Sequence, residues 1–155
     1  MKDKKEIVQE QIFIEEAFKV AEKSNCLHRH VGAVLVKDNH ILLKSYNNIP
    51  NEINICSKEG CMREKENIKS GEKVERCRVV HAEQQLIIDC ALNKINPQGC
   101  KVYCTHSPCV VCAKILANAE IKEICYAIDR DDDNFKSLFK DSKMIFKKIY
   151  RGGNI

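Results

Sequence analysis

Two short motifs place possible metal ligands beside a carboxylate. They are His81-Ala82-Glu83 and Pro108-Cys109-Val110-Val111-Cys112. One histidine and two cysteines are side chains that zinc prefers, and three protein ligands leave its fourth position open to water. Glu83 need not bind the metal and can carry a proton instead. The motifs together predict a zinc site suited to hydrolysis.

The spacing within each motif indicates how the ligands come together. Cys109 and Cys112 are three residues apart, so on a helix they share one face. In the first turn, the positive end of the helix dipole favours the thiolate form that binds metal. His81 and Glu83 begin another predicted helix. We expect both helix starts to meet at the carboxyl ends of strands, where open α/β sheets place their active sites.

A structural zinc knuckle or a chance C-x-x-C pattern is the alternative to a reactive site. C-x-x-C alone is weak evidence, but a structural site usually has four protein ligands. Three ligands with a nearby glutamate therefore favour an open site. We expect His81, Cys109 and Cys112 to bind Zn²⁺, which lowers the pKa of water toward about 7. Glu83 would move the proton of that water.

Hydrophobic periodicity and turn residues predict the elements that position these motifs. The expected helices are 6–23, 81–93, 108–119 and 131–140, and the expected strands are 31–37, 41–46, 101–105, 123–128 and 144–150. Asp38-Asn39 forms a hairpin turn between the first two strands. The strand and helix alternation in the second half predicts parallel neighbours with right-handed crossovers. The fold class is therefore α/β, a three-layer α/β/α sandwich with a five-stranded mixed sheet.

Length and composition limit the classes of protein. The 155 residues fit one domain over 1–155, and a hydrophobic content of 44% is enough for a core. No run approaches the about 18 apolar residues of a membrane helix, and the charged start lacks a signal peptide pattern. We therefore expect a cytoplasmic protein without a membrane partner. The net charge of +4 is small, and the sequence has no obvious stripe of lysine and arginine of the kind that binds duplex nucleic acid.

Ten cysteines are many for such a protein, and metal binding explains the clustered ones better than disulfides do. Cys90, Cys100, Cys104 and Cys125 lie in apolar segments and are expected to be small buried residues. Residues 47–80 form a long polar segment without a sustained period, and three more cysteines lie in it. A loop of that length is usually functional or held by something.

The H-x-E…P-C-x-x-C pattern is typical of zinc-dependent nucleobase deaminases, and the resemblance extends beyond it. The segments from Cys26 to Asp38 and from Tyr46 to Pro50 resemble those of deoxycytidylate (dCMP) deaminases in the cytidine/deoxycytidylate deaminase superfamily. So do Cys56-x4-Cys61, Cys77-x3-His81-Ala82-Glu83 and Thr105-His106-Ser107-Pro108-Cys109. The similarity covers about Cys26 to Tyr126, in the same order and spacing.

This resemblance implies a cytidine deaminase-like fold and hydrolytic deamination of dCMP to dUMP for thymidylate synthesis. It implies that Asn47 contacts the sugar, that the Ala82 N–H lies near the attacking oxygen, and that Ser107 contacts the base. It also implies a homo-oligomer and dCTP and dTTP as effectors.

The chain departs from the family at Asn48, where a glycine is usual, and after Tyr126, where an aromatic residue is common. Candidates for phosphate contacts are Arg29, His30, Lys44 and Arg130, with ordinary surface charge as the alternative.

Some members of this family carry a structural zinc near the remaining cysteines. Four thiolates from Cys26, Cys56, Cys61 and Cys77 would make a closed tetrahedral site and would anchor the 47–80 loop. Cys61 is the least firmly assigned of the four ligands, and His28, His30 or His106 could take its place at the zinc. Free thiols are the alternative.

Two other functions stay open. One is a deaminase acting on another cytosine or adenine nucleoside or nucleotide, or on tRNA. The other is a non-catalytic module that binds zinc or a nucleotide. Retention of Glu83 argues against the module, because a structural site has no use for this carboxylate.

Overall fold

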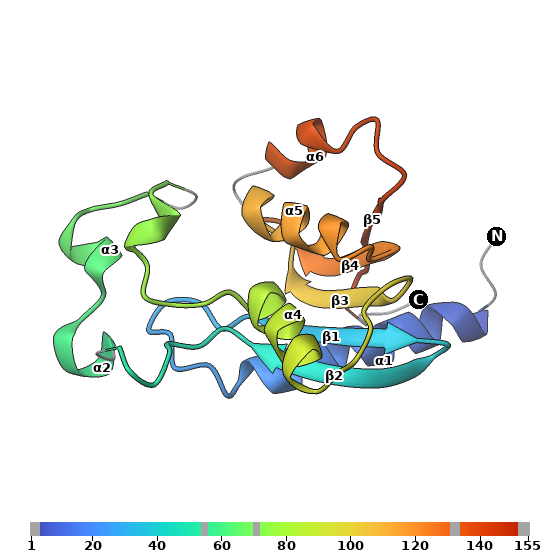
Figure 1. Cartoon of the computed structure of the whole chain (residues 1–155), viewed down its shortest axis with the longest axis horizontal. Coiled ribbons are helices and arrows are strands. Elements are labelled where there is room, and N and C mark those ends of the chain that lie inside the picture. Colours follow the sequence, from blue (N-terminus) through green and yellow to red (C-terminus); the bar gives the residue numbers. More distant parts are fainter. Residues whose placement is uncertain (1–3, 54–55, 70–71, 131–133, 152–155) are drawn as a thin grey trace.

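The computed structural model describes residues 4–53, 56–69, 72–130 and 134–151, and Figure 1 shows its elements. The strands are β1 (Gly32–Lys37), β2 (His40–Tyr46), β3 (Lys101–His106), β4 (Glu123–Ile128) and β5 (Ile145–Lys148). The helices are α1 (Lys4–Ala21), α2 (Cys56–Glu59), α3 (Met62–Lys65), α4 (Ala82–Leu92), α5 (Val110–Asn118) and α6 (Asn134–Leu138), with a 3₁₀ turn η1 (Val74–Arg76). Among the described helices, none is long and apolar enough to cross a membrane.

The five strands form one mixed sheet in the order β2-β1-β3-β4-β5. β1 pairs antiparallel with both β2 and β3, whereas β3, β4 and β5 run parallel. The parallel part follows from the crossover helices α5 and α6, each of which returns the chain to the same edge. The predicted mixed sheet is confirmed. Its order brings the start of β1 and the ends of β3 and β4 to one edge.

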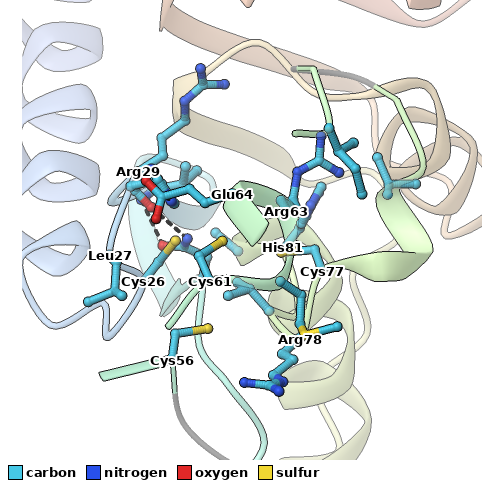
Figure 2. A pocket seen from close by; sticks show the side chains of 18 of the residues that line it. Cys26, Leu27, Arg29, Cys56, Cys61, Arg63, Glu64, Cys77, Arg78 and His81 are labelled. Carbon is cyan, nitrogen blue, oxygen red and sulfur yellow. Dashed lines mark hydrogen bonds and ion pairs between the residues drawn. The ribbon is translucent and has the colours of Figure 1, made fainter. Parts of the chain in front are cut away.

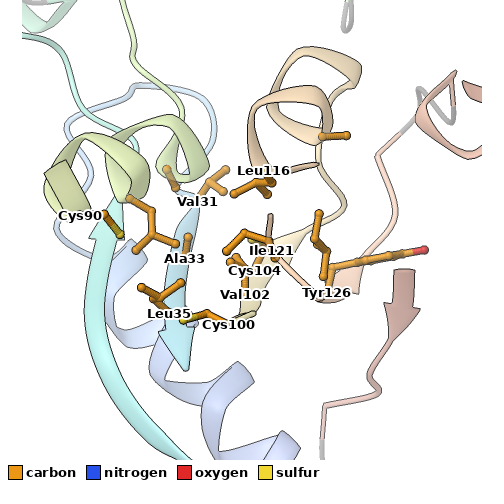
Figure 3. Close-up of a cluster of buried hydrophobic side chains, with 14 of the residues drawn as sticks. Val31, Ala33, Leu35, Cys90, Cys100, Val102, Cys104, Leu116, Ile121 and Tyr126 are labelled. Carbon is orange, nitrogen blue, oxygen red and sulfur yellow. The ribbon is translucent and has the colours of Figure 1, made fainter. Parts of the chain in front are cut away.

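Alternating side chains on the central strands build two apolar layers. Ala33 and Leu35 of β1 face a cluster with α4, α5 and α6, which Figure 3 shows around Val31, Cys104, Leu116 and Tyr126. Val34 and Val36 face α1 on the other side of the sheet. Because residues alternate across a strand, one β1 sequence serves both layers of the α/β/α sandwich.

The β1–β2 hairpin and the α1–β1 contact show why particular residues are needed. Asp38 and Asn39 both have positive φ, at 50° and 62°, as a two-residue type I′ turn requires. A side chain at Gly32 would place its Cβ 2.0 Å from the Ala17 carbonyl oxygen, so only glycine allows this approach of helix and strand. The Gly32 contact fixes the start of β1, which lies beside the candidate site, and the Asp38-Asn39 turn closes the hairpin at the other end of the strand.

Some predicted boundaries were wrong. The 108–119 helix begins at Val110, because Cys109 takes the N-cap position and Pro108 lies before it. The 131–140 helix is described only over Asn134–Leu138, and its expected start at Asp131–Asp133 lies outside the described residues.

The 47–80 segment is not a plain loop. It contains α2, α3 and η1, and it projects from one end of the sandwich (Figure 1). An antiparallel bridge between Asn48 and Val80 closes its base. The Arg63 guanidinium donates to the carbonyls of Lys69, Glu72 and Lys73. Helices of four residues leave no periodic signal, so the sequence could not show them.

Candidate active site

The two motifs meet at the edge of the sheet where β3 and β4 end. His81 is the N-cap of α4, and its backbone N–H donates to the Gln84 side chain at 3.0 Å. Cys109 is the N-cap of α5, which begins shortly after β3. Two helix starts therefore face the same point, as predicted from the spacing. The positive ends of both helix dipoles favour negative charge there.

His81, Cys109 and Cys112 form a cluster whose ligand atoms all lie within 4.8 Å of one another. The His81 Nδ1 atom is 3.6 Å from Cys109 Sγ and 3.4 Å from Cys112 Sγ. A tetrahedral zinc with usual bond lengths separates its nitrogen and sulfur ligands by about 3.5 Å. The distances from His81 to both sulfurs therefore match those between ligands of one Zn²⁺ ion.

The charges of the cluster also suit a cation. Hydrogen bonding with Cys112 and with His81 lowers the pKa of Cys109 to about 3, so this sulfur is a thiolate at neutral pH. The backbone N–H of Cys112 also donates to Cys109 Sγ at 3.4 Å. The hydrogen bond between the Cys112 thiol and the Cys109 sulfur, together with burial, raises the pKa of Cys112. A metal ion that replaces the proton between the two sulfurs would bind both of them as thiolates.

Glu83 is the unusual group of the site. Its side chain is 1% exposed, and neither carboxylate oxygen has a hydrogen-bond partner among the described residues. Burial raises the pKa of Glu83, whereas the positive charges of His81 and Arg130 oppose the shift. A buried carboxylate without a partner is costly for a fold to keep. Such a group indicates a missing partner, such as a water and a substrate.

A cavity of about 590 Å³ opens beside this cluster. His81, Ala82, Glu83 and Asn47 line it on the side of the sheet. The Asn47 amide is already engaged, since Nδ2 donates to the Arg29 carbonyl at 2.7 Å and Oδ1 accepts from the Val31 N–H at 2.8 Å. Asn47 thus shapes the wall of the cavity, and only part of its amide is left for a sugar.

Ser107 is fully buried after β3. Its Oγ accepts a hydrogen bond from the backbone N–H of Arg130 at 2.9 Å, and its own N–H donates to the Ile128 carbonyl. The hydroxyl hydrogen of Ser107 is then the part available to a ligand. The predicted base contact of Ser107 stays a prediction.

The four remaining cysteines line the outer part of the same cavity. Figure 2 shows Cys26, Cys56, Cys61 and Cys77 around it, together with Leu27 and His81. Burial raises the pKa of Cys77, and nearby Cys26 and Cys61 add to the shift. In the described part of the chain, the groups of three or more potential ligand atoms within 4.8 Å of one another do not include these cysteines. The fold places all four on the lining of one cavity without bringing three of their sulfurs within 4.8 Å of one another.

Of the four phosphate candidates, two reach the cavity. Arg29 and Arg130 line it, whereas His30 hydrogen-bonds the Cys26 carbonyl and Lys44 pairs with Glu16 at 2.5 Å. Arg63 and Arg78 also line the cavity, and sequence reasoning missed them. Their places depend on the folding of the 47–80 segment, for which one sequence carries no local signal.

The fold and the cluster together define a three-layer α/β/α protein with an open three-ligand metal site. Residues 7–128 match the family described as the cytidine and deoxycytidylate deaminase zinc-binding region. This chain belongs to that family. The zinc predicted at His81, Cys109 and Cys112 agrees with a zinc-binding family and with the cluster geometry.

Individual relatives agree with this placement. The deoxycytidylate deaminase of Schizosaccharomyces pombe is 31% identical over 114 residues, which cover 74% of this chain and 35% of the relative. That of Mycobacterium phage D29 is 30% identical over 122 residues, covering 76% of this chain and 92% of the relative. The apo dCMP deaminase of cyanophage S-TIM5 superposes with a TM-score of 0.67 at 26% identity, over 95% of this chain and 99% of that one. The chain thus spans about a third of the yeast relative and nearly all of the phage proteins, and the cytidine deaminase-like sandwich is confirmed.

Proposed function

We propose that this chain is a zinc-dependent hydrolase that converts dCMP to dUMP, the step that supplies thymidylate synthesis. The observation that carries the proposal is Glu83, a buried carboxylate without a partner two residues after a metal-ligand histidine. A structural zinc site has no use for such a group. The deoxycytidylate deaminases among the relatives support dCMP as the substrate.

In this proposal each residue of the cluster has one task. His81 Nδ1, Cys109 Sγ and Cys112 Sγ hold Zn²⁺, which when bound lowers the pKa of a water toward about 7. The Glu83 carboxylate accepts a proton from the attacking water and delivers it to ring nitrogen N3 as the water oxygen bonds to C4. Glu83 then takes the remaining proton from the hydroxyl on C4 and passes it to the amino group. The C4–N4 bond breaks as the C4 carbonyl forms, and ammonia leaves.

The neighbouring residues orient the substrate. We assign the Ala82 backbone N–H, at the first turn of α4, a contact with the attacking oxygen. Asn47 is assigned a sugar contact through its second Nδ2 hydrogen, and Ser107 a base contact through its hydroxyl hydrogen. Asn47 and Ala82 line the cavity, and Ser107 lies between β3 and the Cys109 ligand, which supports these assignments.

A homo-oligomer, control by dCTP and dTTP, and a cytoplasmic location belong to the same proposal. Support for the oligomer comes from α4, where Ile88 and Leu92 are exposed apolar side chains on the outer surface of the sandwich. Such side chains are suited to burial between subunits.

The proposal predicts a substrate order. The zinc-loaded chain should release ammonia from dCMP faster than from cytidine, dCTP or an adenosine-bearing RNA hairpin, measured by a coupled ammonia assay. Faster release from another member of this panel would identify a different substrate for the same site. Absence of release from all four, with zinc bound, would contradict the proposal and favour a non-catalytic binding module.

We also propose a second, structural zinc held by Cys26, Cys56, Cys61 and Cys77. These cysteines line the same cavity, and the segment that carries three of them delivers His81 to the site. Binding requires the four sulfurs to move closer together, since no three of them lie within 4.8 Å of one another. Four thiolates would then close a tetrahedral site.

A change of one cysteine tests the structural zinc. Cys56→Ser should reduce bound zinc from two ions per chain to one, measured by metal analysis of the purified protein. Cys90→Ala is the matched control, because Cys90 is buried in the core away from both groups of cysteines. One zinc per chain in the unchanged protein would rule out the second site.

A further inference from the structure

We propose that Gln84 is a positioning residue for the zinc site, because its side chain fixes the backbone of the ligand His81. This inference rests on the proposed function, since it gives a residue outside both motifs a task toward the zinc and the proton transfer. Metal affinity and turnover then depend on a side chain that does not line the cavity.

The imidazole of His81 lacks the support that such a ligand usually has. A metal-binding histidine normally donates its second ring nitrogen to a carboxylate, a carbonyl or a water, which fixes the ring. The His81 Nδ1 atom faces the sulfurs of Cys109 and Cys112. Its Nε2 atom has no hydrogen-bond partner in the described part of the chain. The direction of the ring therefore depends on the backbone that carries it.

That backbone is held at successive points. Val80, just before His81, exchanges two backbone hydrogen bonds with Asn48, at 2.8 and 3.1 Å. The His81 carbonyl accepts the Gln85 N–H at 2.9 Å as α4 begins. The His81 N–H has no partner within the helix, because the first N–H groups of a helix never do. Gln84 Oε1 accepts this N–H at 3.0 Å and so completes the fixation of the ligand.

The position of Gln84 lets one bond hold the whole catalytic turn. Gln84 is the third residue after the N-cap, from which a glutamine or glutamate reaches back and closes a capping box. Glu83 and Ala82 lie between the two ends of this bond. The bond therefore fixes the zinc ligand, the proton carrier and the N–H assigned to the attacking oxygen relative to one another.

The next residue, Gln85, provides a matched comparison. Both glutamines lie in α4, are partly buried and stay outside the cavity lining. The Gln85 side chain, however, points along the helix, where its Nε2 donates to Asp89 Oδ1 at 2.8 Å. Loss of this side chain removes a hydrogen bond of the same helix and leaves the bond to the His81 N–H in place.

Zinc affinity tests the positioning role without turnover. Gln84→Leu should bind the zinc of the cluster about tenfold more weakly, as is usual when an outer partner of a ligand is lost. Competition with a chelator followed by metal analysis measures the affinity, and Cys112→Ser shows which bound zinc belongs to the cluster. Gln84→Glu should restore the affinity, because glutamate accepts the same N–H. Gln85→Leu should leave the affinity unchanged.

Kinetics at saturating zinc add a second readout. Gln84→Leu should lower kcat for dCMP about tenfold. KM should not change, since Gln84 lies outside the cavity lining. Gln84→Glu should again recover the value of the unchanged chain, which a general loss of helix stability would not explain.

The outcomes separate the positioning role from the proposed activity. An unchanged zinc affinity in Gln84→Leu, an equal loss in Gln85→Leu, or no recovery in Gln84→Glu would overturn the role. Weakened zinc binding that Gln84→Glu restores, in a chain that does not deaminate dCMP, would support the role and contradict the proposed function. Circular dichroism shows whether each variant is folded, and Gln84→Ala replaces Gln84→Leu in the same comparisons if the leucine variant misfolds.

Discussion

Replacement of Glu83 by glutamine is expected to lower kcat for dCMP by about 10²- to 10⁴-fold while the protein keeps its zinc. Glutamine has nearly the same shape but cannot accept and release the proton. The three metal ligands are untouched, because His81, Cys109 and Cys112 form their cluster without Glu83. Steady-state kinetics and metal analysis on the same preparation measure both quantities.

Glu123→Gln is the matched control for this change. Glu123 is another buried glutamate, at the opposite end of β4, where it pairs with Lys101 at 2.8 Å. Its loss should affect stability and leave dCMP turnover per bound zinc unchanged. The Glu83 variant should not lose thermal stability, since the carboxylate that it removes has no partner. A Glu83→Gln protein with normal kcat would contradict the assigned proton transfer.

Removal of one zinc ligand is expected to abolish activity together with the catalytic zinc. Cys112→Ser weakens the cluster, because an alcohol is not a thiolate at neutral pH, and His81→Ala removes the nitrogen ligand. Each variant should lose about one zinc per chain and all dCMP turnover. A chelator should do the same to the unchanged protein, and added Zn²⁺ should restore its turnover.

Cys90→Ala serves as the control here also, because it removes a buried thiol that lies outside the cluster. It should retain both zinc and activity. Full turnover in a His81→Ala protein that lacks the catalytic zinc would mean that the metal has no part in the reaction.

The sequence was most informative where local chemistry decides the structure. β4 has the predicted bounds of 123–128, since a short run of apolar residues between turns leaves few alternatives. The two motifs predicted the cluster, because ligand spacing on a helix start is a local property. The start of α5 was predicted at Pro108, because proline is common at the first helical position. The helix begins at Val110, because the Cys109 side chain caps it.

Features that depend on tertiary contacts could not be read from one sequence. Arg29 and Arg130 were two of four phosphate candidates, and only the order β1-β3-β4 shows that these two reach the cavity. The engagement of the Asn47 amide with backbone groups before β1 was also invisible, because it joins segments 16 to 18 residues apart. The 47–80 segment is held by side-chain contacts such as those of Arg63, which no periodicity encodes.

Isotope incorporation from water tests the central claim most directly. The zinc-loaded chain is incubated with dCMP in H₂¹⁸O, and the product is analysed by mass spectrometry. Hydrolytic deamination predicts dUMP that carries one ¹⁸O at C4 and ammonia in equal amount, with both products formed about 10²- to 10⁴-fold more slowly by Glu83→Gln. Absence of dUMP from the zinc-loaded chain, or dUMP without the label, would contradict the account.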